Sequence, residues 1–209
     1  HMRHNRNFLI FLGSDLELHI VVTVISFYAA YATEFAGIHP AVAAGLFVAL
    51  IYAGAIGANF VLGTLGWLSL KHKTMVSKSG AIVAVLLLWA WATPLSFYLA
   101  SFLLGASRGT RMIVFAPAVK KLSGLTDATP YFAVAPILTL PLVIGLPLLS
   151  GIFLDRTAGL GADAYRFIFL AAAMLLPVTR ICVWRTDFAP QLETARCLFF
   201  DDGERRKEA

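Results

Sequence analysis

Three long blocks of this chain contain no charged side chain, and they limit the possible folds more than any other feature. They cover residues 35–70, 79–107 and 128–154. A helix that crosses a bilayer needs about 20 predominantly apolar residues, and every block exceeds that length. Charged residues make up only 14% of the chain, whereas soluble domains contain about 25%. The sequence therefore predicts an all-α integral membrane protein without a soluble domain.

Six membrane spans are predicted from the apolar runs and from the turn-forming residues between them. The third and fourth spans are separated only by Thr93-Pro94. Joining them would give a helix about 60 Å long, roughly twice the hydrocarbon thickness. A cytoplasmic arm at 1–11, a membrane domain at 12–184 and a cytoplasmic tail at 185–209 are expected. The six spans are predicted at 12–36, 41–66, 77–93, 95–119, 130–154 and 164–184.

The distribution of lysine and arginine predicts how the spans are oriented. With a cytoplasmic N-terminus, 13 of the 17 basic residues, Lys78 among them, fall on the cytoplasmic side, and only Arg156 and Arg166 fall outside. Cytoplasmic loops carry an excess of Lys and Arg, so both termini are expected in the cytoplasm. We expect a multi-pass protein of a cell membrane, the bacterial inner membrane. The net charge of +5 is attributed to this orientation and not to nucleic-acid binding.

The motifs of the sequence do not predict an enzyme, a metal site or a cofactor. Ser107 lies in a G-x-S-x-G pattern at 105–109. A serine nucleophile needs a base such as histidine, and the sixth predicted span contains no histidine. Cys182 and Cys197 lack the spacing of metal ligands or of a disulfide framework, so both are expected to be free thiols.

Arg108 and Arg111 lie near the middle of the fourth predicted span. They are one helical turn apart and should point the same way. Because a guanidinium in hydrocarbon is costly, such residues usually face a cavity or a partner. Three interpretations stay open. In the first, the arginines bind an anionic group of a solute, and in the second they neutralise acids of the first span. In the third, Arg111 reaches the cytoplasmic surface.

The first predicted span carries the acids that could face these arginines. Glu17, Tyr28 and Tyr31 share one helical face, whereas Asp15 and His19 share another. The stripe with the tyrosines either lines a wet cavity or consists of an inert acid and two interfacial rings. The predicted pathway for a solute or ion comprises Arg108, Arg111, Glu17, His19, Asp15, Tyr28 and Tyr31.

Small residues predict where helices approach closely. Gly105 and Gly109 form a G-x-x-x-G pair in the fourth span, and Gly54, Gly57 and Gly63 lie in the second. Such residues allow close backbone contact in membranes. The fifth span contains Pro136, Pro141 and Pro147, which favour a kinked helix.

Three segments resemble the C-terminal six-helix half of a major facilitator superfamily transporter. Residues 27–32 resemble the aromatic stretch of the seventh span of that family, and residues 145–155 resemble the small-residue motif of its eleventh span. Residues 63–73 occupy the place of a Gly-x-Leu-Ala-Asp-Arg-x-Gly-Arg-Arg loop. Gly63, Leu65 and Lys71 fit this loop, but Trp67 replaces its acid.

The resemblance implies two inverted three-helix repeats, with a cavity lined by the first and fourth helices. It implies the second and fifth helices at the contact with another half, and the third and sixth facing lipid. The chain would then be half of a secondary transporter that moves a small solute, an anion being preferred because of the arginines. Its partner would be a complementary six-helix half or a second copy, and the former is preferred because two copies would bring four arginines together. The alternative is a non-transporting structural or assembly subunit of a larger membrane complex.

Overall fold

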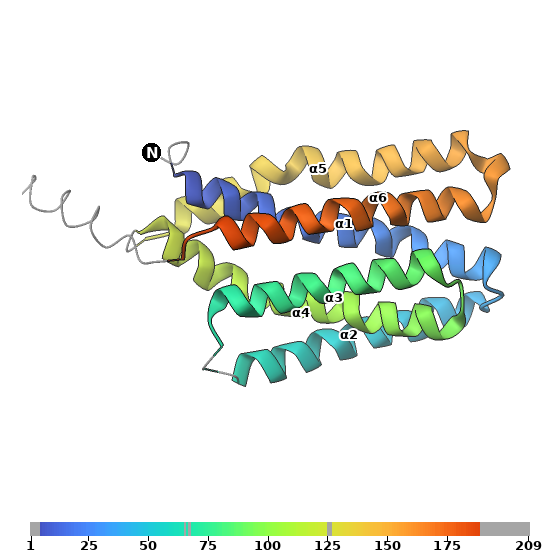
Figure 1. Ribbon diagram of the computed structural model, residues 1–209, viewed down its shortest axis with the longest axis horizontal. Coiled ribbons are helices and arrows are strands. Elements are labelled where there is room, and N and C mark those ends of the chain that lie inside the picture. Colours follow the sequence, from blue (N-terminus) through green and yellow to red (C-terminus); the bar gives the residue numbers. More distant parts are fainter. Residues whose placement is uncertain (1–4, 65, 67, 125–126, 189–209) are drawn as a thin grey trace, which may run out of the picture.

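The computed structural model describes residues 5–64, 66, 68–124 and 127–188. These residues form a bundle of α-helices that run side by side along one long axis (Figure 1). A short 3₁₀ turn, Ala158–Leu160, follows the fifth helix. No strand occurs in the described ranges. The helices are α1 (Arg6–Phe35), α2 (Pro40–Thr64), α3 (Leu70–Ala90), α4 (Pro94–Ser123), α5 (Thr129–Arg156) and α6 (Ala162–Arg185).

Five of these helices, α1, α2, α3, α5 and α6, are long and apolar enough to cross a membrane. The remaining helix, α4, has 30 residues, as α1 does. It carries Arg108 and Arg111 near its middle and two lysines in its last turn, which lower its overall hydropathy. The architecture is that of a multi-pass membrane protein, as the uncharged blocks predicted.

The predicted helix boundaries are confirmed to within a few residues except at the N-terminus of α1 and of α3. The helix α3 begins at Leu70 instead of 77, because the Ser69 side chain accepts a hydrogen bond from the His72 amide and caps the helix. The break at Thr93-Pro94 is confirmed. Thr93 caps α4 through the Ser96 amide, and Pro94 occupies the first turn, where a missing N–H costs little.

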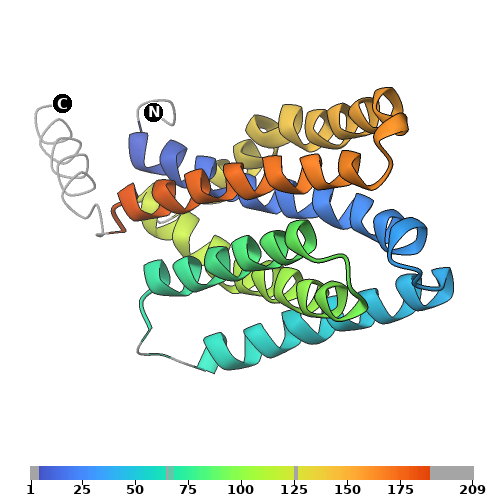
Figure 2. The same ribbon diagram turned by 45° about the vertical axis from the view of Figure 1, so that its right-hand side comes forward.

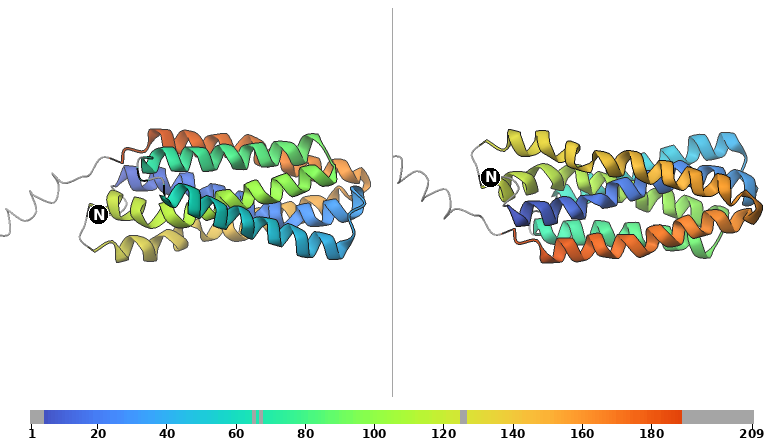
Figure 3. Two further views of the ribbon diagram at one scale, coloured as in Figure 1. Left: turned by 90° about the horizontal axis from the view of Figure 1, so that it is seen from below. Right: turned by 90° about the horizontal axis from the view of Figure 1, so that it is seen from above.

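The helices form two layers that meet along a seam (Figure 2). One layer, the α1 layer, contains α1, α5 and α6, and the other, the α4 layer, contains α2, α3 and α4. Within the layers, α1 packs on α5 and α6, and α4 packs on α2 and α3. Across the seam, the most extensive packing is between α3 and α6. Figure 3 shows the same bundle from below and from above, relative to the view of Figure 1.

Two buried clusters stabilise the two ends of the bundle. At one end, the rings of Tyr28, Tyr31, Phe47, Phe97 and Phe169 are almost inaccessible and lie 5.0–6.3 Å apart in contacting pairs. At the other end, the cluster joins the first turns of α1 to the ends of α4 and α6. The first and last described residues therefore lie at the same end of the bundle.

The contact between α2 and α4 depends on three glycines. A Cβ added at Gly54 would lie 2.0 Å from the Phe102 carbonyl oxygen. One at Gly105 would lie 2.0 Å from the Ile51 carbonyl oxygen, and one at Gly109 would be 2.4 Å from that of Ala55. The prediction of close approach is confirmed at these positions.

The same prediction is wrong at Gly57 and Gly63, where a Cβ would meet nothing within 4 Å. The helix α5 runs through its three internal prolines without interruption. Only Tyr131, Ala135 and Thr139 of α5 are buried, so most of its surface faces outward.

We expect Gly105→Ala to destabilise the protein by about 1–3 kcal/mol, because the methyl group would force the backbones of α2 and α4 apart. Gly57→Ala is the matched control. This substitution adds the same methyl group into open space. Because alanine has a higher helix propensity than glycine, the stability of the protein should be unchanged or rise by up to about 1 kcal/mol. Thermal unfolding of both variants in detergent measures the difference. Equal stability of the two variants would contradict the assigned contact.

Candidate functional site

An ion pair connects α1 to α4 across the seam. The Arg111 guanidinium donates to both carboxylate oxygens of Asp15, with Nε–Oδ1 2.5 Å and Nη2–Oδ2 2.7 Å. Asp15 is buried, whereas 32% of the Arg111 side chain is exposed. The guanidinium also lies 4.4 Å above the centre of the Phe115 ring, which adds a cation–π contact. The fork of Arg111 is therefore directed at an acid of the same chain.

A second ion pair connects α1 to α3. The Lys78 ammonium donates to Glu17 Oε2 at 2.5 Å and to the Ser14 carbonyl oxygen at 2.6 Å. The other carboxylate oxygen of Glu17 accepts from the Ser107 hydroxyl at 2.6 Å. Ser77 in turn donates to the Ser107 carbonyl oxygen at 3.2 Å. Glu17 thus has a partner on both oxygens.

The two pairs line the same small pocket, and among the described residues no hydrogen bond joins one pair to the other. Glu17 and Lys78 are 7% and 2% exposed. Removing such charges from water costs several kcal/mol per ion, and only good geometry with additional hydrogen bonds compensates for this cost. The network meets this condition, since the acids of α1 face cations of the α4 layer at hydrogen-bond distance. We call Asp15, Glu17, Lys78, Ser107 and Arg111 the seam network.

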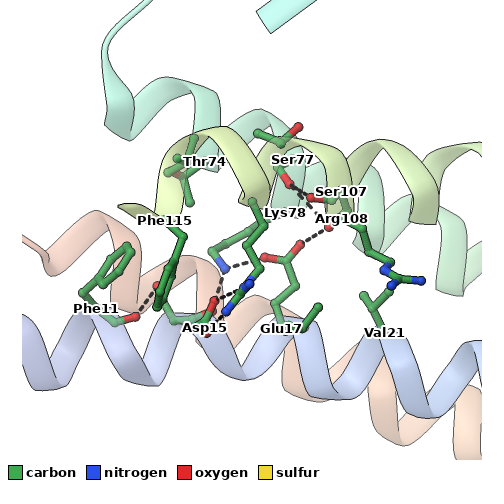
Figure 4. Close-up of a pocket in the computed structure, with 15 residues that line it drawn as sticks. Phe11, Asp15, Glu17, Val21, Thr74, Ser77, Lys78, Ser107, Arg108 and Phe115 are labelled. Atoms are coloured by element: carbon green, nitrogen blue, oxygen red, sulfur yellow. Dashed lines mark hydrogen bonds and ion pairs between the residues drawn. The ribbon is translucent and has the colours of Figure 1, made fainter. Parts of the chain in front are cut away.

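Arg108 differs from every other charged residue of this site. It is exposed and forms neither an ion pair nor a hydrogen bond with any residue in the described part of the chain. Its side chain extends toward Val21 and away from the Asp15 end of the site (Figure 4). The two arginines, although one turn apart, therefore have different surroundings.

The remaining predicted pathway residues lie elsewhere on α1. Tyr28 and Tyr31 belong to the aromatic cluster, where Tyr28 shares a 3.0 Å hydrogen bond with the Ser101 hydroxyl of α4. They do not line the pocket that contains Glu17. His19 is half-buried, and its Nε2 has no hydrogen-bond partner among the described residues.

The space around the seam network is small. A cavity of about 30 Å³ lies between α1, α3 and α4, and Arg108 and Arg111 contribute to its wall. This volume accommodates a water molecule or two, so an organic solute could meet Arg108 only on its exposed side, outside the cavity. Within the described residues, no group of three His, Cys, Asp or Glu side chains is placed to hold a metal ion.

Sequence reasoning missed Lys78. The start of the third helix was predicted at 77, so Lys78 was placed at the cytoplasmic boundary. Because α3 begins at Leu70, Lys78 lies two turns inside the helix and is buried. Ser69 at a capping position ahead of the apolar run was the available signal. Cys182 is free as predicted, and Cys197 lies outside the described residues.

No family model, curated protein or solved structure matches this chain. The fold and the seam network define an α-helical multi-pass membrane protein whose helix layers are joined by buried ion pairs.

The network generates a stability prediction. Lys78→Met should destabilise the protein by about 3–5 kcal/mol, because Glu17 would stay buried without a cation. The double variant Glu17→Gln/Lys78→Met should recover most of this loss, since a neutral amide can still accept from Ser107. Thermal unfolding of the single and double variants gives the coupling energy.

Lys73→Met, on the same helix but only half-buried, is the control and should change stability by less than about 0.5 kcal/mol. Additive effects of the Glu17 and Lys78 substitutions would mean that the two residues do not interact.

Proposed function

We propose that this chain is one half of a secondary active transporter and moves a small solute by alternating access with a second six-helix half. The observation that carries the proposal is the arrangement of charges inside the helix bundle. Two acids of α1 are neutralised by the α4 layer, and Arg108 of α4 has no counter-ion among the described residues. Ionisable residues inside a membrane usually mark a substrate or ion pathway.

The packing of the layers supports two inverted three-helix repeats. If α1, α2 and α3 correspond to α4, α5 and α6, the α1–α6 contact corresponds to the α4–α3 contact. The α1–α5 contact then corresponds to α4–α2, and α3–α6 corresponds to itself. Under this correspondence, the helices of the α1 layer map onto the helices of the α4 layer. Internal repeats of this kind place substrate sites near the midplane, between repeats or halves.

The exposed faces of α2 and α5 support the need for a partner. On α2, Tyr52, Ile56 and Phe60 form a stripe that is 66–73% exposed. On α5, Ile137, Ile144 and Leu148 are 58–68% exposed. Such apolar faces meet either lipid or another helix bundle. We propose that a complementary half packs here, with lipid around the rest.

A complementary half remains preferred over a second copy of the chain. Because Arg111 pairs with Asp15, two copies would bring two uncompensated Arg108 residues together instead of four free arginines. Two guanidinium cations in one cavity still repel each other at low dielectric constant. The proposed location is a cell membrane, with both ends of the chain in the cytoplasm.

A second candidate is a non-transporting structural or assembly subunit of a larger membrane complex. The observation that favours it is the completeness of the seam network. Both acids are fully paired, and the adjacent cavity holds no more than water. Charges arranged in this way stabilise a bundle without taking part in transport.

Isolation of the chain from its native membrane with associated proteins separates the two functions. For a half-transporter, we expect a stoichiometric six-helix partner. Its first and fourth helices should carry the polar residues that complete the cavity. Recovery only with a large cofactor-bearing complex would contradict the transport proposal.

Once the partner half is known, uptake of labelled organic anions into vesicles tests Arg108. Arg108→Ala should abolish uptake while the protein remains folded, because this side chain has no structural partner within the described residues. Arg111→Ala is a poor test, since it leaves Asp15 buried without a cation and should reduce the amount of folded protein. Arg156→Ala, at the exposed end of α5, is the control and should retain uptake.

The orientation is tested with single cysteines in a variant that lacks Cys182 and Cys197. Lys120→Cys and Gly159→Cys place exposed thiols at opposite ends of the bundle. An impermeant thiol reagent should label Lys120→Cys only from the cytoplasmic side and Gly159→Cys only from the outside. The reverse pattern would overturn the proposed topology.

A further inference from the structure

In an α4 that crosses the membrane centrally, Arg108 would be too far from either surface to be neutralised there. It lies midway along α4, about 21 Å from each end of the helix at 1.5 Å per residue. Half of the hydrocarbon core measures about 15 Å. An arginine near a helix end can reach the headgroups, but one at the centre requires a counter-charge or water beside it.

The acids near Arg108 are already paired. Both carboxylate oxygens of Asp15 accept from Arg111, and the two of Glu17 accept from Lys78 and Ser107. Redirecting Glu17 to Arg108 would leave the buried Lys78 without a carboxylate, and redirecting Asp15 would break its bidentate pair with Arg111. Any counter-charge for Arg108 therefore comes from outside the described part of this chain.

Apolar side chains lie on one side of Arg108, whereas Glu17 and Ser107 line the same pocket on the other. Leu18 and Val21 of α1 are the apolar residues of this wall. Met112, one turn further along α4, is 74% exposed. A ligand whose charge meets the guanidinium would therefore place the rest of its surface against hydrocarbon side chains.

We propose that Arg108 binds the carboxylate of a small organic monoanion with an apolar body, on the face shared by α1 and α4. The planar guanidinium fork matches a carboxylate in a bidentate pair. Because Arg108 is the one cation of this face without a partner among the described residues, a monoanion would neutralise it completely. A dianion would retain a charge in apolar surroundings, which is unfavourable.

This inference assigns different roles to the two arginines. Arg108 contacts the ligand, whereas Arg111 is held by Asp15 and positions α4 against α1. Selective transport of such a solute rests on the proposed transport function. Binding of the solute to Arg108 requires only the full chain in a membrane.

Benzoate is a suitable probe because it combines one carboxylate with an apolar ring. Isothermal titration of the full chain in nanodiscs, corrected with empty nanodiscs, should show saturable binding of benzoate. Benzamide, a neutral molecule of the same shape, and inorganic phosphate should bind at least about tenfold more weakly. Phthalate, with a second carboxylate, should also bind more weakly than benzoate.

The variants localise the site. Arg108→Gln should weaken benzoate binding at least about tenfold, whereas Arg108→Lys, which keeps the charge but loses the fork, should weaken it less. Arg156→Gln should bind as the unsubstituted chain does. Thermal unfolding of Arg108→Gln should be unchanged, which excludes loss of the fold as the cause.

Undiminished binding by Arg108→Gln, equal binding of benzamide, or no saturable binding of benzoate would overturn the proposal. The last result, together with a carboxylate of the partner half cross-linked beside Arg108, would assign the counter-charge to the partner. Binding without uptake would contradict transport and leave the site intact. Uptake that survives Arg108→Gln would contradict the site and leave transport intact.

Discussion

The burial of two acids of α1 inside a membrane-spanning bundle is the constraint on which the meeting of the two layers depends. Asp15 and Glu17 cannot remain charged in this environment without cations, and both cations come from the opposite layer. The ion pairs therefore also fix the rotation and the vertical register of α1 against α3 and α4. Hydrophobic burial cannot set this register between membrane helices, because lipid tails solvate apolar side chains as well as a neighbouring helix does.

Within the α4 layer, close backbone contact complements these ion pairs. Gly54, Gly105 and Gly109 bring α2 and α4 together so closely that a single methyl group would overlap a carbonyl oxygen. This contact leaves one side of α4 for the seam and another side uncovered. Arg108 lies on the uncovered side, whereas Ser107, the preceding residue, lies in the seam. Adjacent residues of one helix thus have different surroundings, one inside the seam and one on the exposed surface.

The transport proposal depends on this separation. A cation that is paired within the bundle stabilises one arrangement of helices, and an unpaired cation at the same depth can recognise an anion from outside. Tyr28 and Tyr31 belong to the structural group, since their rings lie in the aromatic cluster away from the seam cavity. The proposed ligand face lies around Arg108, which no other helix of the described chain covers.

The amino-acid sequence by itself determined the class of fold, since the length of the apolar blocks and the breaks at residues such as Thr93-Pro94 depend only on local chemistry. It also placed charges on the first and fourth helices. It could not decide which charges meet. Lys78 became a buried partner of Glu17, and Arg111 rather than Arg108 paired with Asp15, because pairing depends on how helices are rotated and shifted against one another. That choice arises from packing between residues far apart in the chain, so only the tertiary structure decided it.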